Sequence, residues 1–264
     1  MLSNFGNRKD RTKYKTVLEK DKVFVEQFLN RFYRSFENLF TDKSYASYVF
    51  IERLKKFDAI RFDETDKDLF PLKFAFDDME ESCEGKLEGG LLMPIMKHGV
   101  ILLDMDFKNL SKAEGIHTLI HEMVHAMSLV EVFEDEKKVY KCGVNRSGRT
   151  FNRLNEGITE YISQLVWSDM YKNKTCPGIG RYDLEVKAAE MVMSLFESKE
   201  YFVEEYLING TELQREMKVM KNNEGQTLFD FIKSFDKKGM RHKATQKIFT
   251  DKIKDFKNNC EIVK

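Results

Sequence analysis

The sequence predicts a mainly helical α+β protein with one small sheet, and three observations support this fold class. Only 3 of the 264 residues are proline and 14 are glycine, while 22 phenylalanines and 13 methionines are available for a core. Apolar residues recur at helical spacing along most of the chain. Only residues 91–107 read as two apolar runs around a glycine turn, which is typical of a β-hairpin.

The N-terminal region is expected to form two amphipathic helices and a connector. Apolar residues make one stripe from Val17 to Phe40, with charges on the opposite face, and residues 45–57 repeat this pattern over a shorter length. Residues 58–90 are acidic and irregular, with one short strand predicted at 70–76. Their carboxylates lack the spacing of a calcium-binding loop, so we expect a solvated acidic surface.

The middle of the chain contains the hairpin and a strongly apolar helix. The turn falls at residues 97–99, and Val100–Met105 is the strongest strand prediction. Ser111 followed by Glu114 forms a capping box, so the next helix should extend over about residues 112–130.

A polar loop at residues 141–150 separates that helix from another, which begins near Phe151. Four more helical patterns follow, joined by short polar links, at residues 183–196, 201–208, 228–235 and 244–256.

Charge and cysteine content exclude several classes of protein. Lys plus Arg and Asp plus Glu both number 44, so no net charge attracts nucleic acid or an anionic membrane. No apolar run approaches the roughly 18 residues of a membrane span, and no signal peptide follows the basic N-terminus. The 4 cysteines lie too far apart for a compact metal site. We expect a soluble, cytoplasmic protein, although a secreted chain without its leader would look the same.

The string His121-Glu122-Met123-Val124-His125 indicates metal chemistry. Residues four apart share a helix face, so both imidazoles can bind one ion while Glu122, about 100° around the axis, leans toward the open side of the metal. The alternative is that these residues only pack in an ordinary amphipathic helix. Isolated polar groups among so many apolar neighbours would then be costly to bury.

A second string, from Leu154 to Tyr161, contains two carboxylates one helical turn apart, Glu156 and Glu160. One of them could complete a set of two histidines and a glutamate, which is an established zinc site with a fourth position open for water. The other carboxylate would then lie just outside the ligand set, next to the ligands.

These strings resemble the gluzincin metallopeptidases, which share HExxH on one helix and a glutamate ligand on a following helix. Asn155-Glu156-Gly157 is similar to the NEG of the aminopeptidase-type members, and the resemblance extends from Ser111 to Tyr161. It implies that Glu156 is the third zinc ligand. It also implies that Glu160 accepts a hydrogen bond from His121, as an acid does in thermolysin-like members.

The resemblance also implies a zincin-like fold, in which a small mixed β-sheet packs on the HExxH helix and a helical C-terminal lobe follows. Val100–Met105 would then be the edge strand along which a peptide binds. The 30 residues between His125 and Glu156 exceed the spacing in thermolysin and the aminopeptidases. The GxMEN string of the exopeptidases is missing, so an endopeptidase is the more natural inference.

The expected activity is zinc-dependent hydrolysis of a peptide or protein substrate. His121, His125 and Glu156 would hold Zn²⁺, and Glu122 would act as general base for the attacking water. Tyr161 and Tyr182 are candidates for stabilising the oxyanion, together with three residues that no motif singles out, Tyr201, Arg153 and Arg181.

The other histidines are expected outside the ligand set. His117 lies one turn before His121, too far along a straight helix to share the ion, so packing or contact with the ligands is expected. His98, in the predicted turn, and His242 are expected at the surface.

We expect a single domain over residues 1–264, because no repeat or linker divides the chain. A subdivision would separate an N-terminal helical and loop region, a metal-site core and a helical C-terminal lobe, at residues 1–90, 91–170 and 171–264. Two other functions stay open: a zincin-like metal-binding protein that regulates or binds a partner without turnover, and a zinc hydrolase with a non-peptide substrate. The sequence predicts no oligomeric state.

Overall fold

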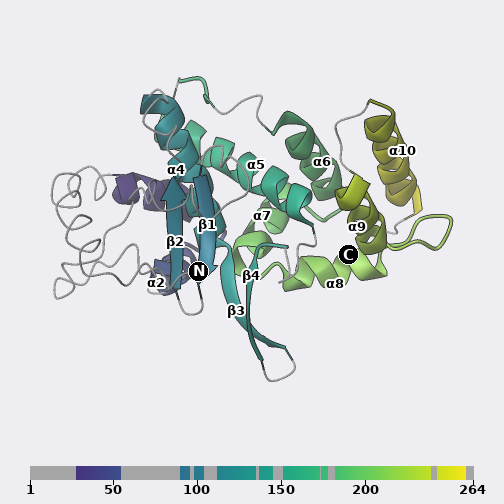
Figure 1. The fold of residues 1–264 in the computed structure, drawn as a ribbon, viewed down its shortest axis with the longest axis horizontal. Coiled ribbons are helices and arrows are strands. Elements are labelled where there is room, and N and C mark those ends of the chain that lie inside the picture. Colours follow the sequence, from purple (N-terminus) through teal and green to yellow (C-terminus); the bar gives the residue numbers. More distant parts are fainter. Residues whose placement is uncertain are drawn as a thin grey trace, which may run out of the picture.

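The computed structural model describes residues 28–54, 90–95, 98–103, 112–134, 137–144, 151–172, 174–177, 182–238 and 243–259. This part of the chain is mainly helical (Figure 1). Residues 28–37 are helical. The labelled helices that follow are α2 (Lys43–Leu54), α4 (Lys112–Met127), α5 (Asn152–Met170), α6 (Asp183–Met193), α7 (Lys199–Ile208), α8 (Thr211–Val219), α9 (Leu228–Lys238) and α10 (Lys243–Asn259).

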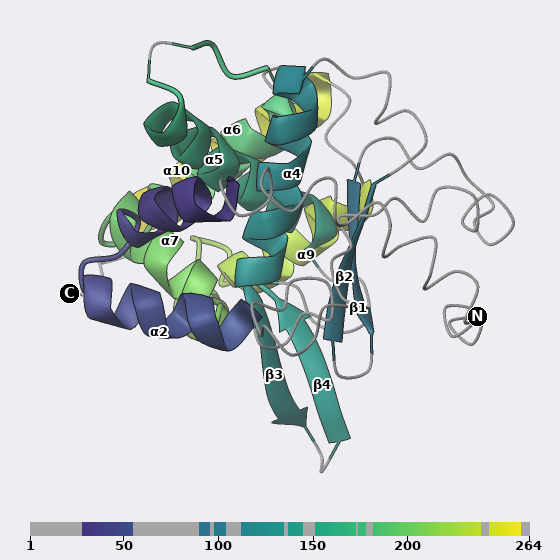
Figure 2. The same ribbon diagram turned by 90° about the vertical axis from the view of Figure 1, so that its left-hand side faces the viewer.

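Two β-hairpins accompany these helices, and each is a separate two-stranded sheet. Strands β1 (Gly90–Ile95) and β2 (His98–Leu103) pair antiparallel and lie against α4. Strands β3 (Leu129–Glu134) and β4 (Lys137–Cys142) also pair antiparallel, and their ribbon extends away from the helices (Figures 1 and 2).

The predicted small mixed β-sheet is therefore wrong, and with it the zincin-like fold class. A mixed sheet needs a parallel pair, which requires a long crossover between neighbouring strands. The described strands pair only with the strand that follows after two residues, so each hairpin closes on itself. The mixed sheet was implied by the family resemblance, whereas the residues themselves predicted only the β1–β2 hairpin and a short strand at 70–76.

Most predicted helices occur near their expected positions, with some differences at the ends. The helix expected to reach Phe40 ends at residue 37, and α4 ends at Met127 because Leu129 already begins β3. His98, expected in a turn, is the first residue of β2. Helix α8 and the β3–β4 hairpin were not predicted. The predictions for residues 17–27, for the connector at 58–89 with its strand at 70–76, and for Ser111 lie outside the described residues.

One apolar core joins the helices, from Phe28 near the start to Phe256 in α10. Helix α6 packs between α5 and α10, on the side of the molecule away from β1 and β2 (Figure 1). The core includes residues from all three segments of the alternative subdivision, whose independence stays a prediction. Among the described helices, none is both long and apolar enough to cross a membrane.

Candidate metal centre

Helix α4 presents the two histidines of the HExxH string on one face. Its apolar residues Ile120, Met123 and Val124 are fully buried, so the helix runs through the core. His121 and His125 are only 6% and 7% exposed, and their ring centroids lie 4.9 Å apart. Because the two imidazoles lie one helical turn apart on the same face, they can bind a single ion.

Helix α5 brings Glu156 opposite these rings. Its position depends on Gly157, which allows close approach of α6: a Cβ atom there would lie 2.1 Å from the backbone oxygen of Glu185. Any larger residue would force the two helices apart. The glycine of the Asn-Glu-Gly string thus has a packing reason in this fold.

The three side chains meet at the spacing of metal ligands. His121 Nε2 lies 3.2 Å from Glu156 Oε2, and His125 Nε2 lies 3.4 Å from Glu156 Oε1. One donor atom from each of the three residues lies within 4.8 Å of the others. Ligand atoms about 2.0–2.2 Å from a tetrahedral zinc ion stand about 3.3–3.6 Å apart. The donor set and its spacing therefore fit zinc.

Glu160 is the buried partner of His121. Its Oε2 atom lies 3.0 Å from His121 Nδ1, and its side chain is 2% exposed. Gln164 Nε2 donates to its other oxygen, Oε1, at 3.0 Å. Because an ionised carboxylate only accepts, the Nδ1 atom of His121 donates its proton to Glu160. A metal ion would then bind Nε2, the ring nitrogen that lies toward Glu156, once that nitrogen carries no proton.

His117 contributes a third contact to Glu160 and lies outside the ligand cluster. Its Nε2 atom is 3.3 Å from Glu160 Oε1, and its ring packs against Trp167 with centroids 6.1 Å apart. Burial disfavours the charged ring, but contacts with Cys176 and Glu160 outweigh burial and raise the pKa of His117 to about 9. His117 can therefore balance the charge of Glu160.

Both glutamates are held in the ionised form. Burial alone would raise the pKa of Glu160, but hydrogen bonds from His117 and His121 lower it to about 2. The pKa of Glu156 is also lowered, since the nearby His125 and His121 overcome its burial. The pKa of His121 is raised against its own burial by Glu156 and Glu160. At neutral pH the site therefore offers an anionic oxygen between two imidazoles.

The candidate oxyanion residues differ in their distance from this cluster. The ring of Tyr182 stacks on His121, with centroids 5.3 Å apart and planes 12° apart. Tyr161 instead lies beneath the Lys199 ammonium group, 5.2 Å from the ring centroid, and the hydroxyl of Tyr201 donates to Glu216. Of the two tyrosines singled out from the sequence, Tyr182 is therefore the one whose ring stacks on a predicted ligand histidine.

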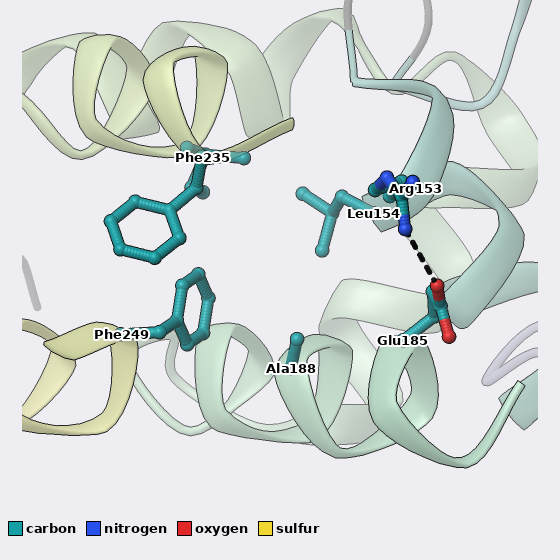
Figure 3. A pocket seen from close by; sticks show the side chains of 7 residues that line it. Arg153, Leu154, Glu185, Ala188, Phe235 and Phe249 are labelled. Atoms are coloured by element: carbon teal, nitrogen blue, oxygen red, sulfur yellow. Dashed lines mark hydrogen bonds and ion pairs between the residues drawn. The ribbon is translucent and has the colours of Figure 1, made fainter. Parts of the chain in front are cut away.

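Arg153 lies on α5, as Glu156 does, but its charge is paired with Glu185 of α6. Its Nη1 atom pairs with Glu185 Oε1 at 3.2 Å, at one end of an apolar pocket that the rings of Phe235 and Phe249 close from α9 and α10 (Figure 3). The residues that line this pocket include none of the predicted zinc ligands. Arg181 lies outside the described residues.

Two residues near the site were not predicted. Thr159 Oγ1 lies 3.2 Å from His125 Nδ1, and the hydroxyl of Tyr206 lies 2.7 Å from Thr159 Oγ1. Thr159 could have been suspected, because it follows Glu156 by three residues and so lies near it on the helix surface. Tyr206 carries no such signal, since it reaches the site from α7.

Comparison with protein-family models, with curated proteins and with solved structures finds no match to this chain. The resemblance to gluzincins consequently stays a prediction that depends on two short strings.

Proposed function

We propose that the protein is a zinc-dependent metallopeptidase that hydrolyses peptide bonds in a peptide or protein substrate. One observation carries the proposal: donor atoms of His121, His125 and Glu156 converge from α4 and α5 within 4.8 Å of one another. Two histidines and a glutamate are a common ligand set of hydrolytic zinc sites. Glu122, buried at 4% exposure beside the first of these histidines, would be the base.

Zinc held by these three residues would polarise a carbonyl group and make a water molecule more acidic. Glu122 accepts the proton of the attacking water on its carboxylate and returns it to the leaving nitrogen. The negative charge of Glu122 also helps to raise the pKa of His121. Glu160 keeps the proton of His121 on Nδ1. An endopeptidase action and a cytoplasmic location are parts of the proposal that depend on the sequence alone.

Metal content per chain tests the ligand set. By inductively coupled plasma mass spectrometry after identical dialysis, the wild type should retain about one zinc, Glu156→Ala should lose it, and Glu160→Ala should retain it more weakly. Glu114→Gln, an exposed change on the same helix α4, is the matched control and should keep the metal. A wild type that holds no zinc after reconstitution would exclude the hydrolase.

Turnover tests the role of Glu122. Glu122→Gln should retain zinc and lower the cleavage of quenched fluorescent peptides by about 10²–10⁴-fold. Full activity in this variant would contradict the proposed base. If the wild type binds zinc but cleaves no peptide in a broad library, the peptidase proposal fails, and a metal-binding regulatory or partner-binding protein or a hydrolase of another substrate class replaces it.

A further inference from the structure

A buried chain of hydrogen bonds begins at the second ligand histidine. His125 Nδ1 lies 3.2 Å from Thr159 Oγ1, Thr159 Oγ1 lies 2.7 Å from the Tyr206 hydroxyl, and this hydroxyl lies 2.9 Å from Asn155 Oδ1. Thr159 and Tyr206 are fully buried, and Asn155 is 3% exposed. The chain therefore connects α4, α5 and α7 away from water.

The far end of the chain fixes the direction of every hydrogen bond in it. Asn155 Oδ1 only accepts, and the backbone oxygen of the same residue, 3.5 Å from the Tyr206 hydroxyl, is also an acceptor. Tyr206 must then donate its single proton to Asn155, so Thr159 must donate its own proton to Tyr206. Thr159 Oγ1 is left to accept from His125, whose Nδ1 atom consequently carries a proton.

Close packing holds the chain in this arrangement. Gly143, which follows β4 with φ +53°, has no side chain, and a Cβ atom there would lie 2.1 Å from Tyr206 Cε2 and 2.6 Å from Asn155 Oδ1. The backbone at the base of the β3–β4 ribbon thus presses on the two residues that set the hydrogen-bond direction. A ring so enclosed has little freedom to turn its hydroxyl away.

We propose that Thr159 and Tyr206 are positioning residues for His125, which keep its proton on Nδ1 and the lone pair of Nε2 toward the metal. The inference rests on the proposed zinc site. The hydrogen bond made by one ring nitrogen decides which tautomer a ligand histidine adopts, and such outer partners typically change metal affinity by about 10–100-fold.

The two ligand histidines are oriented by different chemistry. His121 donates to the carboxylate of Glu160, whereas His125 donates to a neutral hydroxyl. A second carboxylate behind His125 would place another charge in a buried site that already holds Glu156 and Glu160, and a buried charge without a partner is costly. A chain of neutral groups fixes the tautomer without that cost.

Zinc affinity, measured by competition with a chromophoric chelator, tests the proposal. Thr159→Val, which keeps the shape and removes the hydroxyl, should weaken zinc binding by about tenfold or more, and Tyr206→Phe should weaken it by a smaller factor. Thr159→Ser, which restores the hydroxyl, should bind zinc as the wild type does. Tyr201→Phe, on the same helix α7 but bonded to Glu216, is the matched control and should have no effect.

The possible outcomes test different parts of the proposal. If Thr159→Val and Tyr206→Phe bind zinc within about twofold of the wild type, the proposal is overturned. Weakened binding in Thr159→Ser as well would assign the effect to packing and overturn it too. If Tyr206→Phe alone is unaffected, Tyr206 has no positioning role. Failure of the proposed function is distinguished from these results, because it is read from zinc content and peptide cleavage of the wild type.

A spectroscopic readout separates positioning from stability. In the cobalt-substituted wild type, the Nδ1 protons of His121 and His125 should give two shifted, exchangeable proton resonances. In Thr159→Val only the His125 resonance should broaden by faster exchange with water, while that of His121 is kept by Glu160. Unchanged exchange at His125 in Thr159→Val would contradict the proposal even if the variant were less stable.

Discussion

Two buried or half-buried glutamates show how neighbours decide the charge of a single residue. Burial disfavours ionisation of both. At Glu160 the hydrogen bonds from His117 and His121 reverse this effect, and the pKa falls to about 2. At Glu205, on α7, burial raises the pKa, and the negative charges of Glu212 and Glu216 on α8 raise it further. The neighbours of Glu160 stabilise its ionised form, whereas Glu205 destabilises the fold when it is ionised.

Glu205→Gln should therefore stabilise the protein in a pH-dependent way. Because the folded-state pKa of Glu205 exceeds its ordinary value of 4.5, its contribution to stability is fully present below that value and is lost as pH rises through the folded pKa. Replacement by the neutral amide should raise the free energy of unfolding at pH 7 by less than about 1 kcal/mol, and have little effect near pH 4.

Thermal unfolding at the two pH values checks this expectation. Glu197→Gln, an exposed change before α7, is the control and should behave as the wild type at both. An equal gain for Glu205→Gln at pH 4 and pH 7 would show that the amide stabilises by something other than removal of charge.

The residues of the proposed zinc site were predictable where they share a helix. His121 with His125, and Glu156 with Glu160, are pairs four residues apart, and this spacing alone places each pair on one face. How the two pairs face each other depends on the packing of α4 on α5, which sequence spacing does not encode. The same holds for Tyr206, which lies on α7 and is connected to His125 only through Thr159 of α5.

At the scale of elements, Arg53 connects the helix that carries the histidines to the helix that carries Tyr206. It is the penultimate residue of α2 and is 7% exposed. Its Nε atom donates to the backbone oxygen of Met127 at 3.2 Å and its Nη2 atom to that of Ile208 at 2.8 Å. These are the last residues of α4 and α7, whose terminal carbonyl groups lack partners within their own helices. A cation there also complements both helix dipoles.

Arg53→Met should thus lower the free energy of unfolding by about 2–4 kcal/mol. Methionine preserves the apolar stem but leaves the buried carbonyl of Met127 without this donor, at about 1–3 kcal/mol, and the part-buried carbonyl of Ile208 also without it, at about 1 kcal/mol. Urea denaturation of the variant and of Arg34→Met, which changes an exposed arginine in the same region, gives the comparison. Equal stability of these two variants would mean that Arg53 has no capping role.

The elements that could be predicted from the sequence are those with a strong apolar period. Helices α4, α5 and α9 bury a continuous stripe, and the β1–β2 hairpin has two apolar strands around a glycine. Helix α8 was missed because its sequence is mostly polar, with Leu213, Gln214 and Met217 as its buried residues. The β3–β4 ribbon was missed because its turn region, from Glu131 to Lys138, is dominated by charged residues, which read as a loop.

At the scale of the whole molecule, a single core of the described residues carries the proposed metal site. Phe28, Phe32, Phe36 and Phe50 pack together near the start of the described chain, and the same apolar cluster continues through α4 and α5 to Phe256. The ligand helices are central to this cluster and are not appended to it. Any free energy gained when an ion joins α4 to α5 should therefore stabilise the folded state as a whole.

Removal of zinc should accordingly lower the Tm of the wild type in one cooperative transition. An ion that binds only the folded state at a free concentration 100 times its Kd adds about 2.7 kcal/mol. For a chain of this size, each 1 kcal/mol shifts Tm by roughly 2–4 °C, so chelation should lower it by about 5–10 °C. Differential scanning calorimetry with and without chelator measures the shift, and Glu156→Ala should unfold at the same temperature in both conditions. An equal shift in that variant would mean that the chelator acts elsewhere.

Two transitions in the wild type, of which only one responds to zinc, would instead support independent units such as residues 1–90, 91–170 and 171–264. A single shared core can lose the stabilisation by the ion only as a whole.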